Sequence, residues 1–128
     1  SLEGMLTLAL ALDPTLAQVN GADHWKHSQV ASSVEARLNL TRAGLGKVRE
    51  VTGNLKADAR ERVSAALTAV DDAQTKLQVE IRNARTIDET GWTDVREALG
   101  AAFALYARTV LAAATTADAA LTQAPAGQ

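Results

Sequence analysis

Apolar residues recur at alternating steps of three and four in three long segments of the chain. In the segment from 92 to 120, one such series is Trp92, Val95, Leu99, Ala102, Tyr106, Val110, Ala113, Ala117 and Ala120. Steps of three and four place side chains on one face of an α-helix, because the helix has 3.6 residues per turn. The pattern predicts a long amphipathic helix.

Two earlier segments carry the same period. Between residues 55 and 85 the series is Val63, Ala66, Val70, Ala73, Leu77, Ile81 and Ala84, and between 23 and 51 it is Val30, Val34, Leu38, Thr41, Leu45 and Val48. Charged and amide residues fill the intervening positions, as on the solvated face of a helix. None of the three segments shows the two-residue alternation of a strand, so an all-α fold is predicted.

The first twenty residues form a more apolar segment. One helical stripe is Leu2, Met5, Ala9, Leu12, Leu16 and Val19, and three further leucines, Leu6, Leu8 and Leu10, lie outside it. Pro14 has no backbone N–H and Asp13 is a good helix cap, so we expect a break or bend at Asp13. The additional leucines exceed what one buried face requires and need a cover, so we expect a dimer whose contact uses residues of this segment.

Short polar connections separate these segments and define the expected architecture. Turn signals occur at Asn20-Gly21 and at Thr52-Gly53-Asn54, and Thr86 with Glu89 has the spacing of a capping box. Short loops force neighbouring helices to be antiparallel. We therefore predict a single domain over residues 1–122. It is an elongated antiparallel bundle of the four-helix up-down type, with three long helices, a shorter or bent N-terminal helix and a flexible tail at 123–128.

Two glycines interrupt the second long helix. Gly44 and Gly46 each cost about 1 kcal/mol relative to alanine inside a helix. They indicate either a site of close helix contact or a weak point.

Composition narrows the partners that the chain is expected to have. The 128 residues carry a formal charge of -2, and the basic residues are dispersed, so a nucleic-acid partner is not expected. The apolar stretch near the C-terminus contains Arg108 and Asp118, which favours a packed helix, and no transmembrane segment is predicted. Cysteine is absent, which excludes disulfides but leaves both cytoplasm and periplasm open.

The histidines offer the only grouping with metal-ligand chemistry. His24 and His27 are three residues apart, so they share a helix face, and Asp23 adds an oxygen. Zinc sites normally need four ligands, so Asp23, His24 and His27 form an incomplete metal site, and a solvated helix start is the simpler interpretation. No cofactor is predicted.

Large aromatic side chains are few, at 3% of the chain. Trp92, Phe103 and Tyr106 lie on the face or flank of the last helix, and we expect them to belong to the core. The alternative is a small ligand pocket between helices that these three residues line.

No catalytic motif accompanies the helical pattern, so we expect a protein that is not an enzyme. The favoured function is protein interaction or self-association, as a homo-oligomer or with a protein partner. One alternative is an extracytoplasmic sensor or carrier that holds a small molecule or metal between helices. Another is a surface-adsorbing structural protein similar to the alanine-rich helical phasins.

Overall fold

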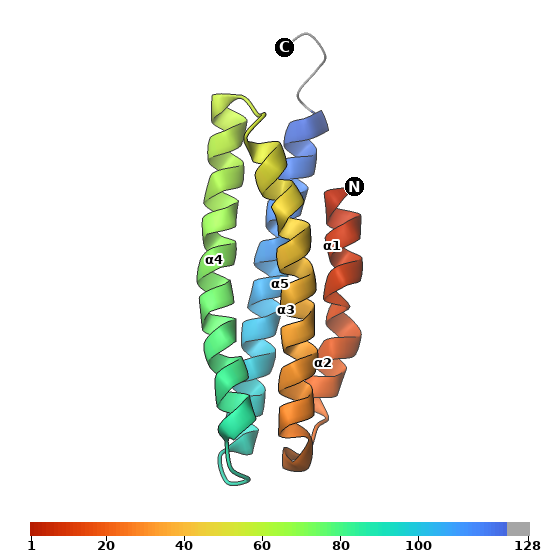
Figure 1. Cartoon of the computed structure of the whole chain (residues 1–128), viewed down its shortest axis with the longest axis vertical. Coiled ribbons are helices and arrows are strands. Elements are labelled where there is room, and N and C mark those ends of the chain that lie inside the picture. The colour runs from red at the N-terminus through yellow and green to blue at the C-terminus, as the bar shows by residue number, and fades with distance from the viewer. Residues whose placement is uncertain (123–128) are drawn as a thin grey trace.

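A computed structural model describes residues 1–122 as helices joined by short turns (Figure 1). The elements are α1 (Leu2–Leu10), α2 (Leu12–Asn20), a 3-10 turn η1 (His24–Lys26), α3 (His27–Thr52), α4 (Ala57–Thr86) and α5 (Trp92–Thr122). The all-α prediction is confirmed. The predicted tail at 123–128 lies outside the described residues.

The helices form an elongated antiparallel bundle. The short helices α1 and α2 continue one another in direction, so together they make the first of four rods, and α3, α4 and α5 make the others (Figure 1). The first rod packs on α3 and α5, while α4 packs on α3 and most extensively on α5. The predicted up-down bundle with a shorter, bent N-terminal member is therefore confirmed.

The centre of the core is α5, which contacts each of the other α-helices, α1, α2, α3 and α4. Its buried face is broader than the predicted stripe, because Phe103, Ala107 and Ala114 are buried in addition to Tyr106 and Val110. A helix covered on several sides needs apolar residues over a wider arc than one stripe provides. Alanines in its second half let the neighbouring helices approach closely.

By length and composition, α5 is also apolar enough to cross a membrane. Of its most apolar stretch of 18 residues, 44% is buried in the bundle. The core helix of a bundle has the same composition, since its apolar face is covered by protein.

The break in the first rod lies at Ala11, not at the predicted Asp13. Ala11 has a φ of 43°, in the left-handed region, which is the one positive φ of a non-glycine residue in the described chain. Asp13 and Pro14 instead belong to the first turn of α2. Proline is tolerated there because the first N–H groups of a helix have no partner within the helix.

This break changes which leucines of the first rod are buried. Leu6 and Leu10 are fully buried in the chain's own core, and Val19 is almost fully buried. Leu8, in contrast, is 81% exposed. The expectation that a dimer contact covers the extra leucines is wrong for Leu6 and Leu10, because the chain's own helices cover them. Only Leu8 of the three faces outward.

The predicted capping box before the last helix is also wrong. Thr86 is the final residue of α4, and its hydroxyl donates to the carbonyl of Arg82. The turn is held instead by Asp88, whose Oδ1 accepts the backbone N–H of Gly91 at 3.0 Å. Asp88 therefore takes the place that the spacing assigned to Thr86.

A carboxylate of α5 holds the start of α1. Asp118 Oδ1 and Oδ2 accept the backbone N–H groups of Leu2 and Glu3, at 3.0 and 2.9 Å. These N–H groups have no partner within α1, and negative charge is favourable at a helix N-terminus. Asp118 thus links the first rod to the last.

The two glycines of α3 have different environments, and their alanine variants should differ in stability. A Cβ at Gly44 would lie 2.6 Å from Leu6 Cδ2, whereas a Cβ at Gly46 would meet nothing within 4 Å. We expect Gly46→Ala to raise the free energy of unfolding by up to about 1 kcal/mol, through helix propensity alone. Gly44→Ala should lower it by about 1 kcal/mol, because Leu6 is fully buried and cannot move away freely. Urea denaturation of both variants tests this, and equal effects would contradict a close contact at Gly44.

Candidate functional site

The three aromatic residues predicted on the last helix lie in the core. Phe103 and Tyr106 are fully buried, and Trp92 is 3% exposed. The indole Nε1 of Trp92 donates to the carbonyl of Ala22 at 2.9 Å. Trp92 lines a hollow at the surface that Phe103 and Tyr106 do not line, so the three residues do not together surround that hollow.

The Tyr106 hydroxyl shares a buried hydrogen bond with Thr41 Oγ1, at 2.5 Å. The Thr41 hydroxyl also lies within hydrogen-bond distance of the carbonyls of Arg37 and Leu38. Burial raises the pKa of Tyr106 above its usual 10.0, although the hydrogen bond with Thr41 and the charge of Arg42 partly oppose this rise. The neutral phenol is the form that the fold favours.

This pKa shift predicts an alkaline loss of stability. Below pH 10 the phenol is protonated in both the folded and the unfolded chain, so its contribution is complete. Above pH 10 the unfolded chain releases the proton first, and the free energy of unfolding should fall until the pH passes the raised pKa of the folded state. Tyr106→Phe should cost about 1 kcal/mol at pH 7 by removing the hydrogen bond, and should abolish this part of the alkaline dependence. Urea denaturation between pH 8 and pH 11 distinguishes these cases, and equal alkaline slopes for both proteins would count against a buried phenol.

The two histidines hold the end of α4. His24 Nε2 lies 2.7 Å from the carbonyl oxygen of Ile87, and His27 Nδ1 lies 2.8 Å from that of Ala84. A carbonyl only accepts, so each imidazole donates an N–H to a group that α4 cannot satisfy itself. The rings stack with centroids 4.8 Å apart and 7° between planes.

The structure does not assemble the predicted metal ligands. Asp23 and His24 border the same surface hollow, but His27 does not. Among residues 1–122, no group of three or more histidine, cysteine, aspartate or glutamate side chains is arranged to hold a metal ion. The paired histidines have a hydrogen-bonding role in the described structure.

Removing one of these bonds should weaken the junction between α3 and α4. His27→Ala should lower the free energy of unfolding by about 1 kcal/mol, since the Ala84 carbonyl loses its donor. The control is Gln29→Ala, at an exposed position two residues away, which should change it by less than about 0.5 kcal/mol. Equal losses in thermal denaturation of the two variants would contradict the helix-end role of His27.

A surface hollow of about 530 Å³ lies beside this junction. Trp92 and Arg96 form part of its wall, and Arg96 donates to the Ala22 carbonyl at 3.2 Å. Trp25 borders the hollow and is 74% exposed, with Lys26 Nζ 4.9 Å from the centroid of its indole. We call Trp25 and this hollow the Trp25 surface.

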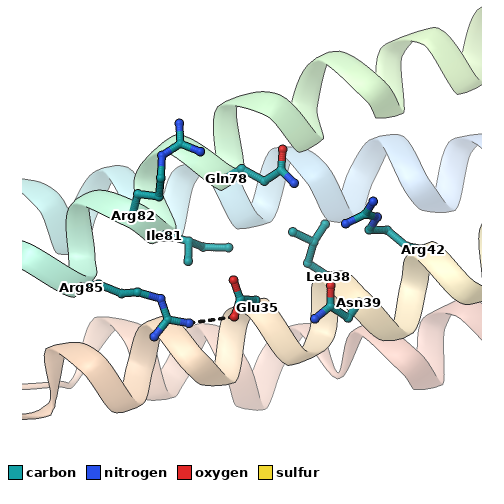
Figure 2. A pocket seen from close by; sticks show the side chains of 8 residues that line it. All are labelled: Glu35, Leu38, Asn39, Arg42, Gln78, Ile81, Arg82 and Arg85. Atoms are coloured by element: carbon teal, nitrogen blue, oxygen red, sulfur yellow. Dashed lines mark hydrogen bonds and ion pairs between the residues drawn. The ribbon is translucent and has the colours of Figure 1, made fainter.

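A second candidate surface is the groove between α3 and α4 (Figure 2). Its hollow measures about 310 Å³, and its lining includes the buried side chains of Leu38 and Ile81. Arg85 of α4 donates to Glu35 Oε1 of α3 at 2.8 Å on one side of the hollow. Further along the same groove, a hollow of about 250 Å³ is lined in part by Arg42 and by a second ion pair, Arg49 with Asp71 at 2.9 Å.

The groove also carries polar groups that the sequence interpretation did not single out. Figure 2 shows Arg42 of α3 and Gln78 of α4 directed toward each other above Leu38. Asn39 and Arg82 complete this part of the lining. The available sequence signal was the seven-residue spacing of Glu35, Arg42 and Arg49 on α3, together with the fourteen-residue spacing of Asp71 and Arg85 on α4.

Comparison with protein-family models, with curated proteins and with solved structures gives no match.

Proposed function

We propose that the protein is a non-catalytic helical bundle that acts through protein interaction, and that it self-associates through the Trp25 surface. The observation that supports this most is the exposure of Trp25. It is 74% exposed, whereas Trp92, Phe103 and Tyr106 are all buried. Tryptophan and arginine are among the residue types most enriched where interfaces gain their binding energy, and Arg96 lines the same hollow as Trp25.

The Trp25 surface has the two parts that a symmetric contact needs. A projecting ring lies next to a hollow, so two copies related by a twofold axis can each place Trp25 in the hollow of the other. Burying one tryptophan removes roughly 150 to 250 Å² from water, worth about 4 to 6 kcal/mol, and two would contribute about twice that. Association costs about 4 to 15 kcal/mol, so a weak, concentration-dependent dimer is expected.

The candidate chemical groups have internal partners, which supports a non-catalytic role. Both histidines donate to helix-end carbonyls, and the Tyr106 hydroxyl is buried against Thr41. A sensor or carrier bundle and a phasin-like adsorbing protein are alternatives with less support, because the aromatic residues expected to build a site between helices are packed in the core.

Sedimentation velocity over a range of protein concentrations tests the proposal. The wild-type protein should shift from monomer toward dimer as its concentration rises, while Trp25→Ser should stay monomeric with unchanged helical content. Leu40→Ser is the matched control, since Leu40 is an apolar side chain of α3 that is 51% exposed and lies away from the Trp25 surface. It should associate like the wild type. A wild-type protein that is monomeric up to about 1 mM, where association is worth about 4 kcal/mol, would refute self-association.

A further inference from the structure

In the groove between α3 and α4, side chains of the two helices face each other in pairs at regular intervals. We call each facing pair a rung, and one of the rungs lacks an acidic member. The two ion pairs of the groove, Glu35 with Arg85 and Arg49 with Asp71, are fourteen residues apart on each helix. Seven residues from both, α3 carries Arg42 and α4 carries Gln78. The antiparallel register that forms the two ion pairs therefore places Arg42 opposite Gln78, in agreement with Figure 2.

The central rung lacks the carboxylate that the outer rungs have. Charged residues that flank a helix interface at seven-residue intervals commonly pair with the opposite sign across it. At this rung Arg42 faces a neutral amide. The single acidic residue that lines the hollow is Glu35, and it is already bonded to Arg85.

A second guanidinium reinforces the charge of this rung. Arg82 lies one turn along α4 from Gln78 and lines the same hollow. Neither Arg42 nor Arg82 forms an ion pair within the described residues, 1–122. Arg42 and Arg82 therefore line the hollow without an acidic partner. Leu38 and Ile81, which line it with them, are each 2% exposed.

The net charge of the groove is opposite to that of the chain. Four arginines and two acidic residues line its two hollows, which leaves a formal charge of +2. The whole chain has a formal charge of -2, so the remaining surface carries -4. An acidic ligand is attracted to this groove and repelled by the rest of the molecule.

We infer that the central rung binds a carboxylate from an acidic peptide segment of a partner protein, lying along the groove. The guanidinium of Arg42 can hold a carboxylate through two parallel hydrogen bonds, and the amides of Gln78 and Asn39 add donors. One exposed ion pair raises the affinity for a ligand less than about tenfold, so a single free carboxylate would bind this groove only weakly. A peptide that follows the groove for the roughly 21 Å between the ion pairs can engage both free arginines.

This site is separate from the Trp25 surface and does not depend on self-association. Its test uses fluorescein-labelled polyglutamate as the probe, with binding followed by fluorescence polarisation at low ionic strength. The wild-type protein should bind it, and the affinity should fall as salt is added. Arg42→Gln and the double variant Arg42→Gln, Arg82→Gln should each weaken binding, the double variant about tenfold or more.

Two further variants decide between a specific groove and general attraction. Arg62→Gln removes the same charge from an exposed position of α4 outside the groove, and it should change the affinity less than twofold. Gln78→Glu supplies the missing carboxylate within the chain, so it should weaken polyglutamate binding at least as much as Arg42→Gln does and raise the melting temperature by about 1 to 3 °C.

Three results would overturn the inference: no polyglutamate binding by the wild-type protein, equal losses for Arg42→Gln and Arg62→Gln, or unchanged binding by Gln78→Glu. Circular dichroism of each variant establishes that it is folded. Free glutamate as competitor separates the two sources of carboxylate, because a free amino acid that displaces the probe at equal concentration would show that no peptide is needed and would overturn the peptide assignment.

Discussion

The burial of α5 is the constraint on which the rest of the structure depends. This helix is apolar over a broad arc, and its aromatic residues Phe103 and Tyr106 are fully buried. One partner helix cannot cover such an arc, so α3, α4 and the rod made by α1 and α2 all pack on it. The left-handed residue Ala11 lets the short rod follow that surface with Leu6 and Leu10 turned inward. The surfaces left for binding are therefore grooves and ends outside the core.

The long helices could be predicted from the sequence because their burial is periodic. Val34, Leu38 and Leu45 of α3 are buried as the three- and four-residue steps require. The first rod was predicted less well, since the phase of its buried face depends on one backbone conformation at Ala11. Alanine carries no local signal for the left-handed region, which glycine and asparagine usually occupy. Tertiary packing decided that position.

The candidate surfaces were harder to predict than the fold. The sequence correctly favoured a core position for Trp92 and Tyr106, but it did not reveal that His24 and His27 bind the carbonyls at the end of α4. Those contacts join residues about sixty positions apart. The groove depends on the register between α3 and α4, which sets Arg42 opposite Gln78 and which periodicity within one helix does not specify.

Native-state hydrogen exchange measures directly whether α5 is the covered centre of a bundle that one chain completes. In dilute protein, the backbone amides of the middle of α5, around Tyr106 and Val110, should exchange slowest, at the rate set by global unfolding. The amides of α1 should exchange faster, because α1 is short and has solvent on one side. Equally fast exchange in α5 and α1 would contradict the central position of α5.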